Sequence, residues 1–381
     1  MARFVLAAAV FLLNVASASA FSWDPSREQR ALQLVRQFQM THSVPSIGGS
    51  VVIDGRLLFA GSGDANWLLI PSGEAIRYHV GSLTKQITAA GVLAMIEDGT
   101  IVPSTHAPLT LDTSLRDLFP NVSLSLDAGK ITVRQLLTMT SNIPSYTDDA
   151  LVFKADQSGI APAARPADAH QIIELLKTYR LSGSAGQFEY SNTNYFILAL
   201  IISALRGGDS PQSTPAFHIH LRDRILAKAG MATSGFVGEP TPAGFTDAPP
   251  TFVRPELLDR GAWPRGAGDL ISTPSDLARW NIALMGGQVL SLPMVRTMLA
   301  PAVPVKNSGP YRGCNYAMGW YRCERPTYRF YQHDGVISGF MASNIIGQNA
   351  NGSWMSVTVL GNTDASVDIV ELVRGILEIG N

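Results

Sequence analysis

The sequence has little charge of either sign. Asp, Glu, Lys and Arg make up 15% of its 381 residues, and acids and bases balance to a formal charge of −1. Without a basic excess, the chain has no stripe of cations to neutralise phosphates, so nucleic acid is not expected as a partner. So little charge also argues against a disordered tail or a coiled coil, and the 46% of hydrophobic residues is enough for a sizeable core.

Long hydrophobic runs are also scarce. The longest run in the body of the chain, residues 195–205, is shorter than the roughly 18 apolar residues of a transmembrane helix, so no stable membrane anchor is expected. Residues 1–20 differ: a basic Arg3 is followed by a short apolar stretch and by small residues up to Ala20. This is the pattern of a secretory signal peptide. We expect residues 21–381 to work outside the cytoplasm, in a secreted or periplasmic protein.

Cysteine is nearly absent, since Cys314 and Cys323 are the only two. Outside the cytoplasm such thiols pair, and at nine residues apart in a strand-like stretch they could close a hairpin. The seven histidines show no zinc-ligand spacing except His218-x-His220, which has no third ligand nearby. Neither a metal nor an organic cofactor is therefore expected.

Strand patterns lie near the two ends of the mature chain. At the start, apolar runs at residues 47–53 and 56–60 flank Asp54-Gly55, a pair suited to the positive φ angles of a tight hairpin. Towards the end, short apolar or alternating runs predict strands at residues 328–332, 341–346 and 353–360.

Apolar residues recur at helical spacing elsewhere, and the stretch 238–250, rich in Pro, Gly and Thr, predicts a surface connection. The predicted helices are residues 27–40, 84–98, 132–139, 171–179, 193–206 and 367–379. We expect an α/β fold of the α+β type, in which the terminal strands form one antiparallel sheet with helices on its faces and a mostly helical insertion.

The first motif with chemical potential is Ser82-x-x-Lys85, at the start of a predicted helix. Residues three apart share a helix face, so the lysine amine can reach the hydroxyl, and the N–H groups of the helix start can face an oxyanion. Because one such pair arises easily by chance, Ser82 could equally be an N-cap.

The second and third motifs are Tyr190-Ser191-Asn192 and His333-Asp334-Gly335. A tyrosine beside a lysine can serve as a general base, because a neighbouring cation favours the phenolate. Taken alone, Tyr190 would be a packed aromatic residue and Asn192 an N-cap. Gly335, at the end of a predicted strand, would let a substrate backbone approach the sheet edge.

Together, Ser82-x-x-Lys85, Tyr190-x-Asn192 and His333-x-Gly335 resemble the three active-site motifs of the penicillin-recognising serine hydrolases. This family includes class C β-lactamases, related esterases and serine D-peptidases. The phrases at residues 136–144, 186–195, 266–280 and 316–320 are also similar, so the resemblance covers nearly the whole mature chain.

The resemblance implies a β-lactamase/DD-peptidase-like fold with an antiparallel five-stranded sheet, a helical domain and a site between them. The sheet part would be residues 21–80 and 265–381, and the helical part residues 81–264. It also implies that Ser82 is the acylated nucleophile and that Lys85 and Tyr190 handle protons. Asn192 would bind the substrate amide, and the N–H groups of Ser82 and Val336 would form the oxyanion hole.

The sequence departs from parts of the family at three positions. His333 stands where class C β-lactamases have a lysine and resembles instead D-alanyl-D-alanine carboxypeptidases and D-aminopeptidases. Asp334 and Val336 stand where the carboxypeptidases have hydroxyl groups for the substrate carboxylate, which weakens the carboxypeptidase and β-lactamase interpretations. Asp334 either faces the cleft or turns away to a surface partner. Arg322 either compensates its charge or is a solvated strand residue.

The function expected from the sequence is hydrolysis through an acyl-enzyme on Ser82. The substrates would be small molecules or peptides, namely D-amino-acid peptides, β-lactams or small esters. The alternatives are a non-catalytic penicillin- or peptide-binding sensor of the same fold and a metal-dependent hydrolase. A sensor would need no proton-transfer partners, so Lys85 and Tyr190 argue against it. The sequence does not indicate an oligomeric state.

Overall fold

The computed structural model describes most of the chain from Ala20 to Asn381. The described residues are 20–62, 76–147, 174, 176–181, 186–208, 215–243, 246–247, 264–306, 309–337, 339–363 and 368–381. The expected signal peptide lies outside them except for Ala20. So do parts of the stretches 171–179 and 238–250, although residues 176–178 are helical as expected.

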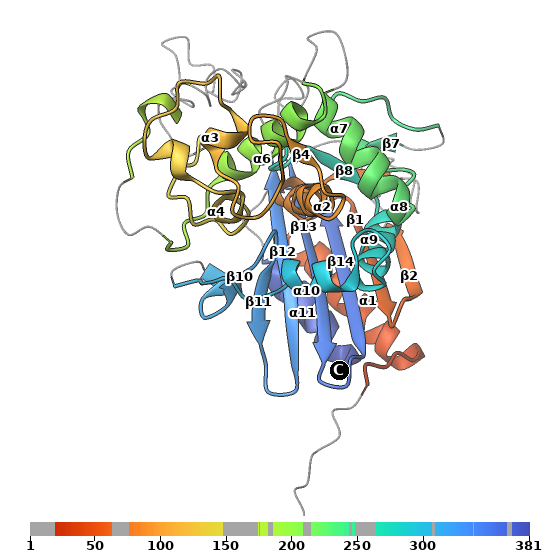
Figure 1. Ribbon diagram of the computed structural model, residues 1–381. Helices are drawn as coiled ribbons and strands as arrows, with labels where there is room; N and C mark the ends of the chain where they lie inside the picture. Colours follow the sequence, from red (N-terminus) through yellow and green to blue (C-terminus); the bar gives the residue numbers. More distant parts are fainter. Residues whose placement is uncertain are drawn as a thin grey trace, which may run out of the picture.

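An antiparallel sheet forms the centre of the molecule (Figure 1), and in the described part of the chain its strands follow the order β2-β1-β14-β13-β12-β11-β10-β9. Strands from the two ends of the sequence meet where Ile47 pairs with Gly361. The strands are β1 Ile47–Ile53, β2 Arg56–Ser62, β9 Val303–Pro304, β10 Asn315–Tyr316, β11 Tyr321–Glu324, β12 Tyr328–Ile337, β13 Phe340–Asn349 and β14 Trp354–Gly361.

The sheet has eight strands where the sequence predicted five, although the fold class is the expected one. The extra strands lie at the far edge, where β9 and β10 have two residues each and leave no periodic signal. The hairpin of β1 and β2 is confirmed, with positive φ angles of 47° at Asp54 and 82° at Gly55. The C-terminal strands are longer than predicted, and β12 includes the whole His333-x-Gly335 motif.

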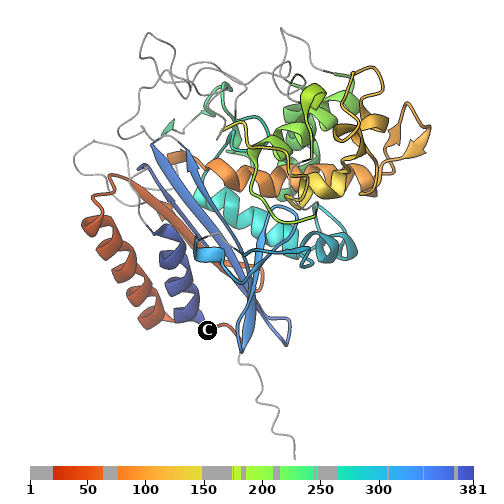
Figure 2. The ribbon, with the colours of Figure 1, turned by 90° about the vertical axis from the view of Figure 1, so that its left-hand side faces the viewer.

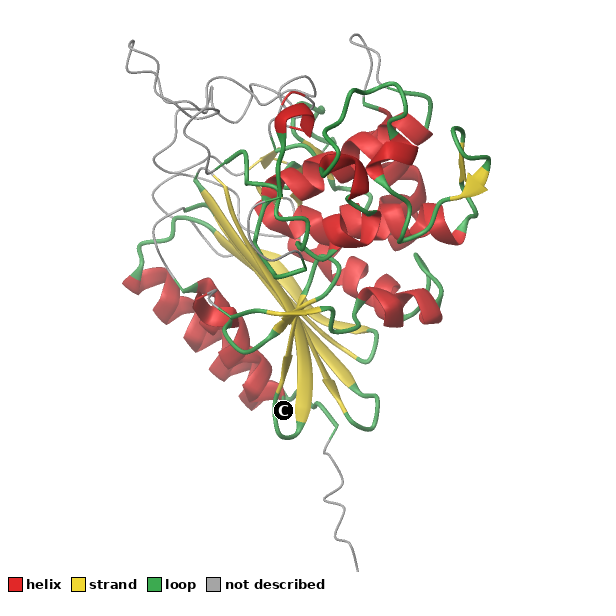
Figure 3. Cartoon of the chain, turned by 60° about the vertical axis from the view of Figure 1, so that its left-hand side comes forward, coloured by secondary structure: helices red, strands yellow, loops and turns green. Residues whose placement is uncertain are grey.

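Helices cover both faces of the sheet, which explains why β13 is buried along nearly its whole length. Figure 2 shows α1 (Pro25–Thr41) and α11 (Ile369–Gly380) packed on one face. On the other face, α9 (Pro274–Met285) lies against β1 and β14. Figure 3 shows the strands running between these helical layers.

Most of the remaining helices gather at one end of the sheet, whereas η6 lies beside α11, where Arg374 donates to the Pro310 carbonyl. The remaining helices are η1 Gly81–Leu83, α2 Thr84–Glu97, α3 Leu115–Leu118, η2 Ala128–Lys130, α4 Val133–Leu137, α6 Asn192–Leu205, α7 Ala216–Leu221, η4 Arg222–Leu226, α8 Ala227–Ala229, α10 Leu292–Met298 and η6 Gly309–Tyr311. The helix α2 is buried on every side from Thr84 to Met95, including its polar residues Lys85 and Gln86. Within the described ranges, no helix combines the length and apolar character needed to cross a bilayer.

Short strands complete the fold outside the main sheet. They are β3 Ile76–His79, β6 Gly235–Phe236, β7 Thr246–Asp247 and β8 Leu270–Ser272, with β4 Ile101–Val102 and β5 Ala107–Pro108 as a separate hairpin (Figure 3). The stretch predicted as a mere connection thus contributes β7, which pairs with β3. An ion pair of 2.6 Å between the buried Arg77 and Asp247 fixes this pairing, a long-range contact that local composition does not reveal.

A buried amide network fastens α2 to the sheet. The Gln86 side-chain oxygen accepts from Trp280 Nε1 (3.3 Å) and from Asn344 Nδ2 (3.1 Å), which joins α2, α9 and β13. Asn281 and Asn344 exchange hydrogen bonds of 2.9 and 3.0 Å, and Thr358 donates to Asn344 at 3.0 Å. Since buried polar groups are costly to leave unpaired, this network holds α2, and the residues that precede it, in one position.

Candidate active site

Ser82 lies in the single turn η1, immediately before α2. The N-cap position of α2 belongs to Leu83 and makes no side-chain hydrogen bond, so Ser82 is not the N-cap. Gly81 has a φ of +50°, and a Cβ there would lie 3.1 Å from Val336 N. The turn is therefore pressed against β12 with the half-buried Ser82 hydroxyl at the junction.

The Lys85 amine is fixed by two hydrogen bonds. Nζ lies 2.7 Å from Ser82 Oγ and 2.8 Å from the carbonyl oxygen of Ala267. It also lies 5.0 Å from the ring centroid of Tyr190 and 5.8 Å from that of Tyr195. Among the described residues no carboxylate forms an ion pair with it, so the amine is enclosed by neutral groups.

Burial dominates the electrostatics of Lys85. Desolvation lowers the pKa of its ammonium well below the usual value, and the carboxylates of Asp334 and Asp269 only partly oppose this effect. The neutral amine is therefore favoured. A neutral amine 2.7 Å from a hydroxyl can accept its proton.

Tyr190 points its hydroxyl at the same atom. Its Oη donates to Ser82 Oγ at 2.8 Å. The segment that carries it is held by a hydrogen bond from Glu189 N to Met139 O (2.9 Å). The contact with Ser82 is as the sequence suggested, and burial shifts the Lys85 amine beside the phenol towards its uncharged form.

Asn192 is the first residue of α6, and Ser191 occupies the N-cap position. Asn192 is therefore not a cap, and its Nδ2 donates to the Thr147 hydroxyl at 3.0 Å. It lines a cavity of about 40 Å³ beside the nucleophile, together with Gly81, Ser82, Tyr146, Pro264, Ala267, Gly268, Val336 and Ile337.

His333 is buried next to these groups but uncharged. Its Nδ1 donates to the Asp334 carbonyl (2.6 Å), which leaves Nε2 as an acceptor 3.4 Å from the Tyr316 hydroxyl. Burial lowers the pKa of His333 to about 4, although the Asp334 carboxylate opposes this shift and Lys85 reinforces it. Near neutral pH, this position therefore supplies no cation.

Gly335 lies tightly against the Ser82 turn. A Cβ at this position would overlap the Val80 carbonyl oxygen and lie 2.8 Å from Ser82 N. Gly335 therefore permits a close approach between β12 and the protein's own Ser82 turn. Val336 follows with its side chain 63% exposed, and its backbone lies against the same turn.

Arg322 does not compensate the charge of Asp334. It forms an ion pair with Glu324 at 2.8 Å on β11, opposite Tyr331 in register. Asp334 is half-buried and forms no ion pair in the described part of the chain. Its charge partly opposes the burial that lowers the pKa of Lys85 and of His333, and it adds to the burial that raises the pKa of Tyr311 and of Tyr321.

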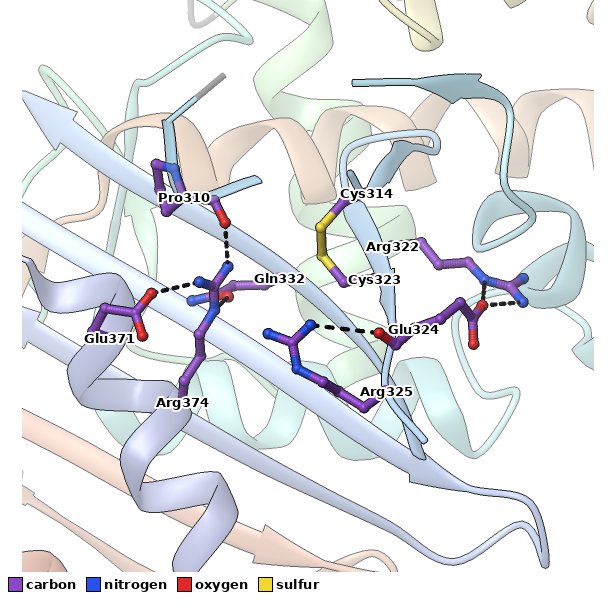
Figure 4. The surroundings of a disulfide bond; sticks show 9 residues. All are labelled: Pro310, Cys314, Arg322, Cys323, Glu324, Arg325, Gln332, Glu371 and Arg374. Carbon is purple, nitrogen blue, oxygen red and sulfur yellow. Dashed lines mark hydrogen bonds and ion pairs between the residues drawn. A yellow bond between two sulfur atoms is a disulfide. The ribbon is translucent and has the colours of Figure 1, made fainter. Parts of the chain in front are cut away.

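Cys314 and Cys323 form the predicted disulfide, with their Cα atoms 4.5 Å apart (Figure 4). The bond ties the start of β10 to β11 and confirms the hairpin. Nearby, Arg374 of α11 donates to Gln332 Oε1 (2.9 Å) and to the Pro310 carbonyl (3.0 Å), so the outer strands are attached to the helix behind the sheet.

The two histidines considered as metal ligands bind different partners. His218 contacts Asp269 at 2.8 Å, and His220 donates to the Gly91 carbonyl at 3.1 Å. Nowhere in the described ranges do three His, Cys, Asp or Glu side chains gather as metal ligands would.

Three contributors to the site were not identified from the sequence. They are the Ala267 carbonyl that accepts from Lys85, the Tyr195 ring over the same amine and the Tyr316 hydroxyl beside His333. The phrases 266–280 and 316–320 resembled family signatures, and Tyr195 ends a third such phrase. Residue type alone cannot show that a backbone carbonyl of alanine will meet a buried amine.

Comparison with known proteins identifies the family of this chain. A family model described as Beta-lactamase matches residues 31–376. The chain belongs to the beta-lactamase family. Within this family, it is 27% identical over 272 residues to PbpX of Bacillus subtilis (strain 168), a candidate penicillin-binding protein. The match covers 70% of this chain and 58% of PbpX.

Solved structures show the same beta-lactamase-family fold. The D-stereospecific amidohydrolase of Streptomyces sp. has a TM-score of 0.70 at 24% identity, covering 93% of this chain and 98% of that one. The D-amino acid amidase of Ochrobactrum anthropi SV3 has a TM-score of 0.69 at 20% identity, covering 93% and 96%. The chain spans between 48% and 60% of the length of the first curated relatives that it matches.

Proposed function

We propose that this protein is a serine hydrolase that forms an acyl-enzyme on Ser82 and releases it to water. The observation that carries the proposal is the convergence of two proton-transfer groups on one hydroxyl. Lys85 Nζ lies 2.7 Å and Tyr190 Oη 2.8 Å from Ser82 Oγ. A non-catalytic sensor of the same fold would have no use for a buried amine at that distance.

In acylation, the Ser82 hydroxyl gives its proton to the neutral Lys85 amine as Oγ bonds to the substrate carbonyl carbon. The carbonyl oxygen becomes an oxyanion, which the N–H groups of Ser82 and Val336 would stabilise. The bond to the leaving nitrogen or oxygen then breaks, and the leaving atom takes a proton from Tyr190 Oη. The Lys85 ammonium returns its proton to the phenolate, so both groups regain their starting state.

Deacylation follows the same path in reverse, with water in place of the leaving group. Water adds to the acyl carbon and gives one proton, through Tyr190, to Lys85. The bond from the acyl carbon to Ser82 Oγ breaks, and Oγ recovers its proton from the Lys85 ammonium. A free acid is released, and no cofactor takes part in either step.

The substrate class that fits best is a neutral or amine-bearing amide or ester, including D-amino-acid amides and peptides. The Asp334 charge acts on Lys85 and His333, and neither of these supplies a favoured cation. A free carboxylate beside the scissile bond would therefore be repelled. A D-amino acid amidase and a D-stereospecific amidohydrolase share this fold, as does a penicillin-binding protein homologue, so the choice of substrate rests on the Asp334 charge.

The protein would act outside the cytoplasm, secreted or in a periplasm. The signal-peptide pattern of residues 1–20 supports this location, and the Cys314–Cys323 disulfide fits an oxidising compartment.

Intact mass spectrometry tests the proposal. The protein is exposed to a p-nitrophenyl ester, a D-amino-acid amide and a β-lactam, and its mass is followed over time. A transient acyl adduct is expected, and it should be lost in Ser82→Ala. Ser203→Ala, which removes another buried hydroxyl within α6, is the matched control and should acylate normally. Ester hydrolysis by Ser82→Ala within a few-fold of the parent rate would overturn the mechanism.

A further inference from the structure

A buried imidazole–carboxylate pair lies behind the site. His218 of α7 donates from Nε2 to Asp269 Oδ2 at 2.8 Å, and both side chains are buried. The imidazole is stacked on Phe236, with centroids 4.1 Å apart and planes at 13°, and it also packs on Phe217. The ring therefore has one orientation. It does not contact Ser82, so any role in the chemistry acts through Asp269.

Asp269 closes the backbone loop that faces Lys85. Its second oxygen, Oδ1, accepts from Gly266 N at 3.0 Å, and its own carbonyl accepts from Val237 N at 2.9 Å. Between these two anchors, the Ala267 carbonyl accepts from Lys85 Nζ at 2.8 Å. The loop that carries the Ala267 carbonyl, which accepts from Lys85, is thus anchored on both sides by hydrogen bonds of Asp269.

The loop fits its surroundings tightly. Gly266 has a φ of +67°, and a Cβ there would lie 2.7 Å from the Tyr195 carbonyl oxygen. Its own carbonyl accepts from the Thr88 hydroxyl, one turn beyond Lys85 on α2, at 2.8 Å. A small shift of the loop would therefore move the Ala267 carbonyl relative to the amine.

The charged and titratable groups around the amine come from several elements. Tyr190 and Tyr195 face it, His333 and Asp334 act on it from β12, and Asp269 acts from the loop. Burial raises the pKa of Tyr146, which lines the cavity beside Ser82, and the Asp269 charge adds to this rise.

The loop's own cation is occupied elsewhere. The Arg265 guanidinium lies 6.0 Å from the ring centroid of Phe196 and 5.6 Å from that of Phe217.

We propose that His218 and Asp269 are positioning residues that hold the Ala267 carbonyl against Lys85 and so orient the amine towards Ser82. The effect that this inference expects on the reaction rate rests on the proposed function, whereas the positioning of the Lys85 amine does not. The His218–Asp269 pair fixes the loop, the loop fixes the amine, and the Asp269 charge favours the ammonium form of Lys85.

Asp269→Asn is the first test, because it keeps the shape of the side chain and removes the charge. We expect kcat/KM for a p-nitrophenyl ester to fall between about 10- and 100-fold, since small misplacements of catalytic groups have effects of this size. Of the two parameters, kcat should fall and KM should change little. The acid limb of the pH profile should move to lower pH, because an anion that favours the ammonium is lost.

The matched control is Asp276→Asn. Asp276, at the start of α9, is equally buried and accepts hydrogen bonds from Thr233 and Ser234. It is not among the charges that affect the pKa of Lys85. It should lose stability without a shift of the pH profile. Identical profiles for Asp269→Asn and Asp276→Asn would overturn the proposal.

His218→Phe and His218→Gln form the second test. Phenylalanine keeps the stacking but cannot donate, whereas glutamine retains an N–H, so glutamine should recover most of the activity that phenylalanine loses. His220→Phe on the same helix is the control and should affect stability alone. Equal kcat values for His218→Phe and His220→Phe would contradict the positioning role.

A readout without substrate separates this inference from the proposed function. The chain has six lysines, so proteins labelled with carbon-13 at lysine Cε give few NMR signals, and Lys85→Met assigns that of Lys85. Its titration midpoint should fall by about half a pH unit or more in Asp269→Asn. A shifted midpoint in a protein that never acylates would refute only the proposed function. An unshifted midpoint in an active enzyme would refute the positioning pair.

Discussion

Lys85 is enclosed on every side, yet no carboxylate in the described part of the structure forms an ion pair with it. A buried ammonium without a partner is costly, so the side chain remains there most easily as a neutral amine. Its two hydrogen bonds, to Ser82 Oγ and the Ala267 carbonyl, suit a group that accepts a proton and passes it on. The burial of α2 thus prepares a base without any dedicated acidic partner.

The pH dependence of catalysis should follow Lys85. Because burial lowers its pKa well below 10.5 and the reaction needs the neutral amine, kcat/KM should rise with pH as the ammonium loses its proton. The rise should end well below pH 10.5. Stopped-flow acylation by a neutral ester between pH 5 and 10 measures this limb. A limb centred near the ordinary lysine value would show that burial does not lower the pKa of Lys85.

If the Asp334 carboxylate faces the cleft, its charge should decide between substrates. Two unit charges about 4 Å apart at a partly solvated site interact by about 4 kcal/mol before screening. Asp334→Thr should therefore raise turnover of benzylpenicillin or of an acyl-D-Ala-D-Ala peptide relative to a neutral ester. The ratio is taken within each variant so that general damage cancels.

Glu28→Gln removes one negative charge from α1, on the other face of the sheet, and is the control for total charge. An unchanged ratio in Asp334→Thr would restore the carboxypeptidase and β-lactamase interpretations.

The contacts of individual site residues were predictable from the sequence only where the partners lie close together in the chain. The contact of Ser82 with Lys85 was predictable, because a three-residue spacing along a helix fixes which side chains meet. The environment of Lys85 was not predictable, because its burial depends on residues far away in the sequence, such as Tyr195 and Ala267. Arg322 has a local partner, Glu324, two residues on, which outweighed the more distant Asp334.

Among the elements, the contact between β12 and η1 positions the nucleophile. Gly335 lies where any side chain would overlap the Val80 carbonyl. Gly335→Ala should therefore push the Ser82 turn away from β12, reducing acylation at least about 10-fold and the free energy of unfolding by about 1–3 kcal/mol.

The control for this variant is Gly61→Ala on β2, where the new methyl group would meet the Phe59 ring at an ordinary 3.6 Å. Ester kinetics and urea unfolding of both variants give the comparison. Full activity in Gly335→Ala would mean that the turn can retreat without losing its geometry.

The elements that the sequence predicted are those with long or distinctive patterns. The Asp54-Gly55 hairpin, α2 and α6 were predictable from turn chemistry and apolar periodicity. The strands β7, β9 and β10 were not, because two residues carry no period and their pairing is decided by distant partners such as Arg77 and Asp247.

At the scale of the whole molecule, the outer strands of the sheet depend on the Cys314–Cys323 bond and on Arg374 of α11. Replacing both cysteines by serine should lower the free energy of unfolding by about 2–3 kcal/mol, because the unfolded chain loses a constraint. Urea unfolding of the oxidised parent, the reduced parent and the double variant measures this change.

Thiol labelling of the denatured, unreduced parent is the accompanying check and should find no free thiol. Two labelled cysteines, or equal stability of the three samples, would contradict the prediction.

The backbone N–H of Ser22 donates to the Gly380 carbonyl at 2.9 Å, so the two ends of the described chain touch. Joining residue 381 to residue 21 through a few glycines would therefore strain nothing, and new ends could be opened in the exposed turn at residues 103–106, between β4 and β5. Such a circular permutant would keep the β1–β14 seam that now unites the first and last strands. In this permutant the Ser82 turn and α2 would be synthesised near the end of the chain, after every strand of the main sheet.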